Sequence, residues 1–392
     1  MKIGIDQLHV YTPSLYLDLK DLAKARQVDP DKYTIGIGQD RMGINPITQD
    51  TVSMAANAAF PLINARNASE IDMIILATES GTDYSKSGAT YLHDLLAIQP
   101  FARAIEVKQA CYSGTVGIMM AYDYVSNHPD RKVLVVASDI ARYGLGTSGE
   151  VTQGAGAVAM IISQNPRVLT LNNDSVPYTF HNFDFWRPNY AKNALVDGKY
   201  SNQAYIDAFQ KTWNEHQRRH HTTLDALAAV CFHLPYSKMG KKALATILDE
   251  ESDTTNRLLT RYEKSVQYTR QIGNIYTGSL YLGFASLLDL DESLNAGETI
   301  GFFSYGSGSV AEFFTGELVE NYRHHLYTSD HEKMLSQRYP LTIEEYETTF
   351  LESLPEDGSS VALSHPQDKA VIQLAAMDQH RRIYQIYDKV EQ

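Results

Sequence analysis

Hydrophobic and polar residues along the first third of the chain follow two alternating periodicities. Short, nearly continuous apolar runs predict strands, and apolar residues that recur every three to four positions predict helices. The predicted elements are a strand at 2–10, a helix at 51–66, a strand at 71–78, a helix at 87–98, a strand at 104–108, a helix at 111–125 and a strand at 132–138. Because the strands are apolar on both faces, they suit a parallel or mixed sheet that is covered on both sides. The predicted fold class is therefore α/β.

Three of these elements have counterparts in the second half of the chain, in the same order. The pairs are the strands 71–78 and 227–232, the helices that begin at 111 and 274, and the strands 132–138 and 300–305. A duplicated α/β half explains this recurrence, and chance matches within a large α/β protein explain it as well. We expect residues 1–165 to form an N-terminal half, and residues 166–392 to form a linker and a C-terminal half.

Composition limits the partners and the compartment. The 392 residues are 43% hydrophobic, enough for a large core, and the net charge of -13 argues against nucleic-acid or anionic-membrane partners. The N-terminus lacks the uninterrupted apolar core of a signal peptide, and no run approaches the roughly 18 apolar residues that cross a bilayer. Two cysteines give no disulfide framework, so we expect a cytoplasmic protein.

Cys111 is the first candidate for chemistry. It lies between an apolar strand and a predicted helix, where the helix dipole and free amides would stabilise a thiolate and lower its pKa. A buried free cysteine also packs as a small hydrophobic residue, and its position alone favours that interpretation. Cys231, inside a predicted strand, fits the core better.

Two further candidates each follow a predicted strand, at the end where open α/β sheets present residues to a cleft. Glu79 would serve as a general acid or base if burial raised its pKa, and His233 would donate to a carbonyl or exchange protons. A solvated cap and a structural histidine explain them equally well. The glycine-rich segment 304–309 offers backbone amides for an oxyanion hole or forms an ordinary hairpin turn.

Two other patterns are rejected. The glycines at 144–149 match a dinucleotide-binding fingerprint by letter, but a strand is predicted at 154–162 where that motif requires a helix. The histidines at 216–221 and 324–325 have neighbouring arginines and no ligands at suitable spacing. We expect both histidine groups to be exposed polar faces, and we expect no metal site.

Four segments taken together resemble hydroxymethylglutaryl-CoA synthase of the compact bacterial type. They are residues 109–114 (QACYSG), 232–239 (FHLPYSKM), 273–281 (GNIYTGSLY) and 304–308 (SYGSG). The resemblance runs through nearly the whole chain. It implies a thiolase fold with duplicated α/β halves in five α-β-α-β-α layers, a homodimer, no metal and no cofactor.

The same resemblance implies an acyltransferase of the mevalonate pathway, which supplies isoprenoid precursors. Such an enzyme condenses acetyl-CoA with acetoacetyl-CoA and water to give 3-hydroxy-3-methylglutaryl-CoA and CoA. By likeness, Cys111 carries the acetyl group, Glu79 is the general base and His233 orients acetoacetyl-CoA. The substrate-binding residues implied in the same way are Tyr143, Asp184, Phe185, Arg187, Lys238, Lys242, Asn274 and Ser307.

One departure and two alternatives stay open. The family often has Tyr-Lys where this chain has Trp186 and Arg187, which leaves the contacts of that segment undecided. A ketoacyl-acyl-carrier-protein synthase III-like enzyme shares the fold and the Cys, His and Asn set, but it makes its carbanion by decarboxylation and needs no base such as Glu79. A catalytically silent scaffold with the thiolase fold is the alternative of another class.

Overall fold

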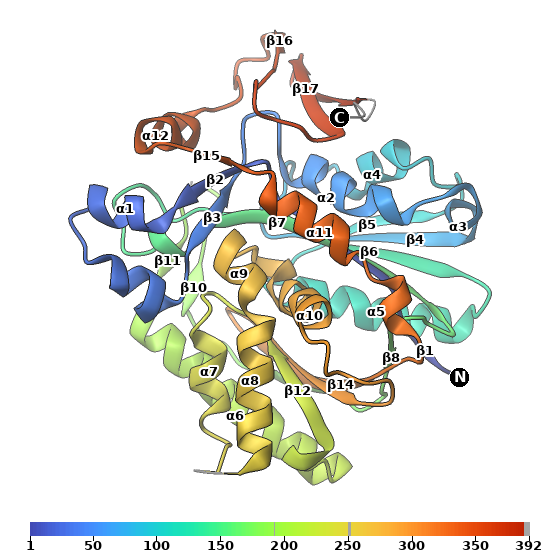
Figure 1. Ribbon diagram of the computed structural model, residues 1–392. Helices are drawn as coiled ribbons and strands as arrows, with labels where there is room; N and C mark the ends of the chain where they lie inside the picture. The colour runs from blue at the N-terminus through green and yellow to red at the C-terminus, as the bar shows by residue number, and fades with distance from the viewer. Residues whose placement is uncertain (192, 250–251, 388–392) are drawn as a thin grey trace.

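A ten-stranded mixed sheet runs through the protein in the computed structural model, which describes residues 1–191, 193–249 and 252–387 (Figure 1). Its strands are β1 (Ile3–Tyr11), β4 (Ile71–Ala77), β5 (Arg103–Val107), β6 (Lys132–Ala141), β7 (Gly154–Gln164), β8 (Leu169–Leu171), β9 (Val176–Thr179), β12 (Leu227–Phe232), β13 (Thr299–Gly306) and β14 (Val310–Leu318). The strand order is β12-β13-β14-β8-β1-β7-β6-β4-β5, and β9 pairs with β14.

The pairing pattern of the sheet occurs twice. In the first half, β4 and β6 are parallel, and β7 and then β1 continue antiparallel. In the second half, β12 and β13 are parallel, and β14 and then β8 continue antiparallel. The repeat predicted from the sequence therefore has a structural counterpart. Because β1 also pairs with β8, the two halves share one sheet, and the division at residues 165 and 166 remains a prediction.

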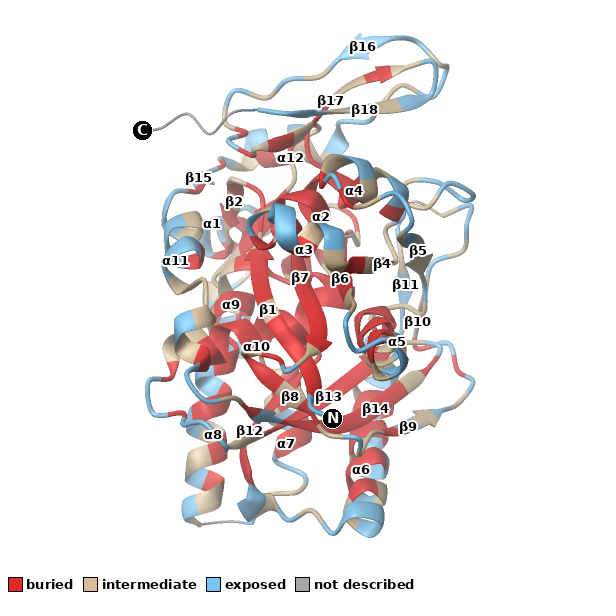
Figure 2. Ribbon diagram, turned by 90° about the vertical axis from the view of Figure 1, so that its right-hand side faces the viewer, coloured by how far each residue is buried: buried red, intermediate tan, exposed pale blue. Residues whose placement is uncertain are grey.

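Helices cover the sheet in alternating layers. The central helices are α5 (Ser113–Asn127) and α10 (Ser279–Leu290), whose apolar residues share one core with both halves of the sheet. The helices that flank the first half are α2 (Thr51–Ala59), α3 (Ala65–Glu70) and α4 (Ala89–Leu95), and those that flank the second are α6 (Gly198–His220), α7 (Met239–Leu244) and α8 (Asp253–Ser265). The α/β class and the alternation of helical and sheet layers are as expected, with the buried strands inside (Figure 2).

The predicted helix at 51–66 is wrong in its length. The chain forms α2, then a 3-10 turn that contains Pro61, and then α3. Proline lacks the amide hydrogen that a helix interior needs, and Asn64 caps the new helix by accepting from the amides of Arg66 and Asn67. The helix expected from residue 111 begins at Ser113 instead, so Cys111 belongs to the preceding turn.

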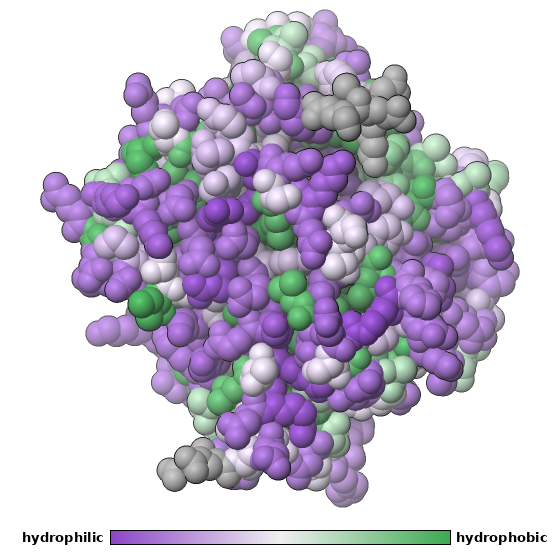
Figure 3. Space-filling model, viewed as in Figure 1, coloured by the Kyte–Doolittle hydropathy of each residue, from purple (hydrophilic) through white to green (hydrophobic). Residues whose placement is uncertain are grey.

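The remaining elements lie around this core. They are β2 (Leu15–Asp18), α1 (Leu19–Ala25), β3 (Arg41–Ile44), β10 (Phe185–Trp186), β11 (Leu195–Val196), α9 (Gln267–Ile272), α11 (Thr328–Ser336), β15 (Tyr339–Pro340), α12 (Ile343–Leu351), β16 (Val361–Ala362), β17 (Ile372–Asp378) and β18 (Arg381–Ile386). The three C-terminal strands form a small sheet beside α2 (Figures 1 and 2). On the face in Figure 3, polar residues predominate and apolar ones are scattered. Within the described ranges, no helix is both long and apolar enough to cross a membrane.

Candidate active site

A pocket with about 500 Å³ of empty space, part of which is open solvent, lies between the two halves of the chain. Its lining residues are Cys111, Tyr143, Phe185, Val196, Ser201, Asn202, Tyr205, His233, Pro235, Met239, Asn274, Tyr276, Tyr305 and Ser307. Six of the residues selected from the sequence are among them, and they come from segments that are far apart in the chain. The fold therefore brings the ends of strands from both halves to one pocket.

A tight turn between β5 and α5 presents Cys111 to this cavity. Ala110 has a φ of 44°, in the left-handed region that non-glycine residues rarely adopt. Ser113 Oγ closes the turn by accepting from the amide of Gln109 at 2.5 Å and donating to the carbonyl of Ala110 at 2.9 Å. Gly306 lies against the same turn, where an added Cβ would be 2.6 Å from the carbonyl oxygen of Gln109. This close approach requires glycine and seats the end of β13 against the thiol.

Glu79 follows β4 and reaches the thiol directly. The Cys111 thiol donates a hydrogen bond to Glu79 Oε1, with the sulfur and oxygen 3.0 Å apart. Burial, followed by the charge of Asp139, raises the pKa of Glu79 to about 8. A carboxyl group with such a pKa exchanges protons near neutral pH, which suits a general acid or base.

The predicted lowering of the Cys111 pKa is wrong. Burial, followed by the charge of Glu79 and its hydrogen bond, raises the pKa of the thiol well above its ordinary value. The helix dipole is weaker here than expected because α5 begins two residues after Cys111, while the carboxylate is in direct contact. The thiol therefore keeps its proton in the free enzyme.

Asp139 is a structural centre of the site that the sequence reasoning missed. It is fully buried in β6, and its Oδ1 accepts from the amides of Glu79 and Ser80 and from the hydroxyl of Thr78, each at 2.9 Å. Its Oδ2 accepts from the amide and hydroxyl of Thr277, just before α10. One carboxylate thus joins the end of β4 to the second half of the chain. An aspartate within the apolar run at 133–141 was the available signal.

His233 follows β12 and is 2% exposed. Burial lowers its pKa to about 3, so the imidazole is neutral at physiological pH. Its Nδ1 has no hydrogen-bond partner among the described residues, and its backbone carbonyl accepts from the hydroxyl of Tyr205 at 2.6 Å. A neutral imidazole that lines the cavity is suited to donate a hydrogen bond to a substrate carbonyl.

Asn274 lines the same cavity from the turn before α10. Its Oδ1 accepts from the amide of Tyr276 at 2.8 Å and the hydroxyl of Ser279 at 2.9 Å, which fixes the side chain. Its amide nitrogen lies 3.4 Å from the hydroxyl of Tyr143. The rings of Tyr143, Phe185 and Tyr276 meet edge to face, with centroids 5.8 to 6.2 Å apart, and form one apolar wall of the cavity.

Five of the residues selected from the sequence are not among those that line the cavity, and one of the five, Glu79, reaches it through its contact with Cys111. Asp184 is fully buried and accepts from the hydroxyl of Tyr305 at 2.8 Å and the amide of Gly308 at 3.1 Å, so it supports the turn that contains Ser307. Arg187 donates to the backbone carbonyl of Glu79.

Lys238 and Lys242 belong to the segment that supplies two lining residues. Lys242 Nζ donates to the hydroxyl of Tyr236 at 3.0 Å, and Lys238 precedes the first residue of α7. The cavity lining includes Pro235 and Met239 from the same segment but neither lysine. Substrate binding by these lysines stays a prediction.

Other sequence interpretations had mixed outcomes. The strand predicted after the glycines at 144–149 is β7, as expected. The histidine group at 216–221 is not wholly an exposed face, because His216 is fully buried in α6 with its Nε2 3.1 Å from the carboxylate of Asp174. The lining residues Val196, Ser201, Asn202 and Tyr205 were missed, because their segment carries no recognisable motif.

Comparisons with known proteins agree with this geometry. The family described as Hydroxymethylglutaryl-coenzyme A synthase N terminal matches residues 1–167, and the corresponding C terminal family matches residues 173–260 and 252–386. A hydroxymethylglutaryl-CoA synthase of Enterococcus faecalis is 52% identical over 91% of this chain and 94% of its own length. A polyketide-biosynthesis 3-hydroxy-3-methylglutaryl-ACP synthase of Bacillus subtilis is 33% identical over 88% of this chain and 87% of its own length.

Solved structures give the same result. A crystal structure of HMG-CoA synthase complexed with CoA is 45% identical, with a TM-score of 0.96 over 98% of this chain and all of that one. A structure of MvaS in complex with 3-hydroxy-3-methylglutaryl-CoA is 35% identical, with a TM-score of 0.88 over 99% of both chains. With both family halves matched and the fold shared along its length, this chain belongs to the hydroxymethylglutaryl-CoA synthase family of acyl-transferring condensing enzymes.

Proposed function

We propose that this protein condenses acetyl-CoA with acetoacetyl-CoA and water to give 3-hydroxy-3-methylglutaryl-CoA and CoA, as a step of the mevalonate pathway. The observation that carries the proposal is the 3.0 Å contact between Cys111 Sγ and Glu79 Oε1, in a cavity that His233 and Asn274 also line. The CoA thioesters are substrates, and no cofactor is needed because the acyl transfer, the addition and the hydrolysis require no external oxidant or reductant.

In the first stage, the Cys111 sulfur attacks the carbonyl carbon of acetyl-CoA, and the bond from that carbon to the CoA sulfur breaks. The thiol proton passes by way of the Glu79 carboxylate to the departing CoA sulfur. The products are acetyl-Cys111 and CoA. Covalent capture divides one difficult condensation into two easier stages.

In the second stage, the Glu79 carboxylate removes a proton from the acetyl methyl group. That methyl carbon is two bonds from the sulfur, so a carboxylate that contacts the sulfur is close enough to reach it. Ser307 lines the same cavity as Cys111, and its amide is the donor proposed for the developing enolate oxygen.

The enolate carbon then attacks the ketone carbon of acetoacetyl-CoA. Neutral His233 donates to a carbonyl of that substrate, and Asn274 orients it. The alkoxide takes up the proton that Glu79 removed from the methyl group, which restores the carboxylate. Water finally cleaves the thioester to Cys111, which releases the product carboxylate and restores the thiol.

The ketoacyl synthase alternative is disfavoured by Glu79. A decarboxylating enzyme generates its carbanion by losing carbon dioxide, and a carboxyl group with a pKa of about 8 against the thiol has no function in that step. A silent scaffold would likewise have no use for a buried Cys-Glu contact, because burying a carboxyl group costs free energy.

The decisive experiment follows the acetyl group. The protein is incubated with acetyl-CoA, quenched in acid and digested, and the modified peptide is identified by mass. We expect one acetyl group on Cys111 and none on Cys231, which is fully buried, followed by discharge when acetoacetyl-CoA is added. Absence of the adduct during turnover would overturn the proposal, and a strict requirement for malonyl-carrier protein would favour the ketoacyl synthase instead.

We also propose a cytoplasmic homodimer that pairs through β5. This strand ends the sheet, its residues are half-buried or exposed, and nearby Phe101 and Met120 are 91% and 38% exposed. An open strand edge beside apolar side chains favours pairing with a second copy. Sedimentation should give twice the chain mass for the wild type and a smaller species for Phe101→Glu combined with Met120→Glu. A monomeric wild type would contradict the dimer.

A further inference from the structure

The loop at 79–88 carries the proposed base but has neither helix nor strand. It connects β4 to α4, and Gly81 and the residues from Asp83 to Lys86 are exposed. A loop of this kind takes its conformation from contacts with the rest of the protein, because it has no backbone ladder of its own. The contacts that hold it therefore decide where Glu79 points.

On its buried side, the loop is held at its first two residues. Asp139 accepts from the amides of Glu79 and Ser80, and the hydroxyl of Thr51 donates to the carbonyl of Ser80 at 2.8 Å. These bonds fix the start of the loop, but they do not reach its middle.

The middle of the loop is held by the hydroxyl of Tyr84, which donates to the carbonyl of Asn189 at 3.0 Å, and from the C-terminal strands. Arg382 of β18 donates from Nη1 to the carbonyl of Thr82 at 3.1 Å, three residues after Glu79. The same guanidinium donates from Nε to Asp50 Oδ2 at 3.1 Å, and its side chain is only 21% exposed. Arg382 thus joins the last strand of the protein to the loop that carries the base.

Asp50 makes this anchor rigid. Its Oδ1 caps α2 by accepting from the amides of Val52 and Ser53, while its Oδ2 accepts from Arg382 and, at 2.8 Å, from the hydroxyl of Tyr384. Asp50 at the start of α2 and Arg382 therefore form a bridge to the loop, and its charged hydrogen bond is directional and partly shielded from water. The loop is therefore anchored to α2 as well as to β6.

We propose that Arg382 is a positioning residue for the condensation stage: its bond to the Thr82 carbonyl fixes the loop so that the Glu79 carboxylate meets the acetyl methyl group. The inference rests on the proposed role of Glu79 as the base. Acetylation needs Glu79 only as the acceptor for the proton of a thiol that it already contacts, whereas proton removal from the methyl carbon depends on the direction of the carboxylate. A misplacement of about 1 Å is enough to slow such a step by up to about a hundredfold.

The test compares the two stages in Arg382→Ala and Arg382→Lys. We expect Arg382→Ala to acetylate Cys111 within about threefold of the wild-type rate and to condense roughly tenfold more slowly. Arg382→Lys retains one donor and should recover part of the condensation rate at an unchanged acetylation rate. Acetylation is read by acid quench and mass, and condensation by the consumption of acetoacetyl-CoA on enzyme that is already acetylated.

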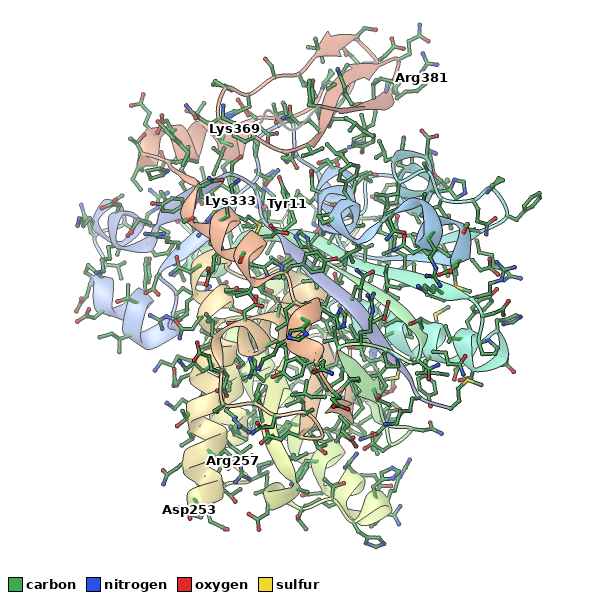
Figure 4. All side chains as sticks on the ribbon, turned by 45° about the vertical axis from the view of Figure 1, so that its right-hand side comes forward. Tyr11, Asp253, Arg257, Lys333, Lys369 and Arg381 are labelled. Carbon is green, nitrogen blue, oxygen red and sulfur yellow. The ribbon has the colours of Figure 1, made fainter. Side chains whose placement is uncertain are left out.

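Two matched controls come from the same strand. Arg381, which is labelled on the outer part of the C-terminal sheet in Figure 4, pairs with Asp378 inside its own hairpin. Arg381→Ala removes a charge from the hairpin without touching the loop, and Tyr384→Phe removes a bond to Asp50 while leaving the Thr82 contact in place. Both should keep the wild-type ratio of the two rates.

Several outcomes would overturn the inference. They are an unchanged condensation rate in Arg382→Ala, an equal loss of both stages in Arg382→Ala and Arg382→Lys, and a loss in Tyr384→Phe as large as in Arg382→Ala. Failure of the proposed function gives a different result, because the wild type would then form no acetyl-Cys111 or Glu79→Gln would condense normally. If the wild type forms acetyl-Cys111 and Glu79→Gln condenses slowly, the ratio of the condensation rate to the acetylation rate in the Arg382 variants tests the role of the arginine alone.

Discussion

Replacing Glu79 by glutamine separates the two stages of the reaction. The change keeps the size of the side chain and removes both the negative charge and the base. In the wild type, Glu79 is the main cause, after burial, of the raised pKa of Cys111. Its removal therefore lowers the pKa of the thiol, which offsets the loss of the proton acceptor. We expect Glu79→Gln to form acetyl-Cys111 within about tenfold of the wild-type rate.

The condensation stage has no such compensation. A positioned general base contributes about 10²- to 10⁴-fold, equivalent to about 3 to 5 kcal/mol of activation free energy, and Glu79→Gln should lose that amount. The pH profile gives a second measure. Because burial raises the pKa of Glu79 to about 8, the fraction of ionised base rises with pH up to that value. The wild-type condensation rate should follow this rise, and the rate of Glu79→Gln should not.

The assay uses one preparation of each protein. Acetylation is measured by acid quench and peptide mass after addition of acetyl-CoA, and condensation by the disappearance of acetoacetyl-CoA over a range of pH. A condensation rate of Glu79→Gln within about threefold of the wild type would refute the role of the carboxylate as base. A proportional loss of acetylation would show instead that Glu79 serves mainly to activate the thiol.

The same contacts make three further predictions. Because the folded pKa of Glu79 lies above its ordinary 4.5, its stabilising effect is full below about pH 4.5 and lost as pH rises through about 8. Between about pH 4.5 and 8, the unfolding free energy of the wild type, measured in urea, should fall relative to that of Glu79→Gln by up to about 1.4 kcal/mol per pH unit. Parallel plots of the two unfolding free energies against pH would contradict this. His233→Ala should slow condensation about a hundredfold. Because the pKa of His233 is about 3, the initial rates of the wild type should show no histidine titration between pH 5 and 7. A titration in that range would exclude a neutral imidazole. Cys231→Ala should acetylate normally and lose about 1 kcal/mol of unfolding free energy; a lost adduct would move the nucleophile to Cys231.

Much of the scaffold could be predicted from local pattern. The apolar runs that became β4 and β12 were visible because strands buried on both faces require nearly continuous hydrophobic residues. Glu79 and His233 were found because each is the first or second residue after such a run, at the carboxyl end where clefts form. The repeat of the pairing pattern then brings these two ends to one cavity.

The sign of the Cys111 pKa shift could not be predicted in the same way. The helix dipole is a local property and is readable from the sequence, whereas the opposing effects are burial and a carboxylate 32 residues away. Asp139 and Arg382 were missed for a related reason. Asp139 stands out locally as a charged residue in an apolar run, but its partners are set by the sheet register, and the role of Arg382 arises from the placement of the last strand beside α2, which has no local signature.

In the proposed mechanism, the contact between Cys111 and Glu79 also sets the order of the two stages. In the free enzyme, the thiol donates to the carboxyl group, and this bond lowers the pKa of Glu79 against the larger effect of burial. Acetylation removes the thiol hydrogen, so the bond is lost and the carboxyl group is left facing the new methyl group. The base thus becomes available for carbon chemistry only after the acyl group has arrived. Because the pKa of the thiol is raised, Cys111 attacks the thioester while its proton passes to Glu79 and does not start as a free thiolate.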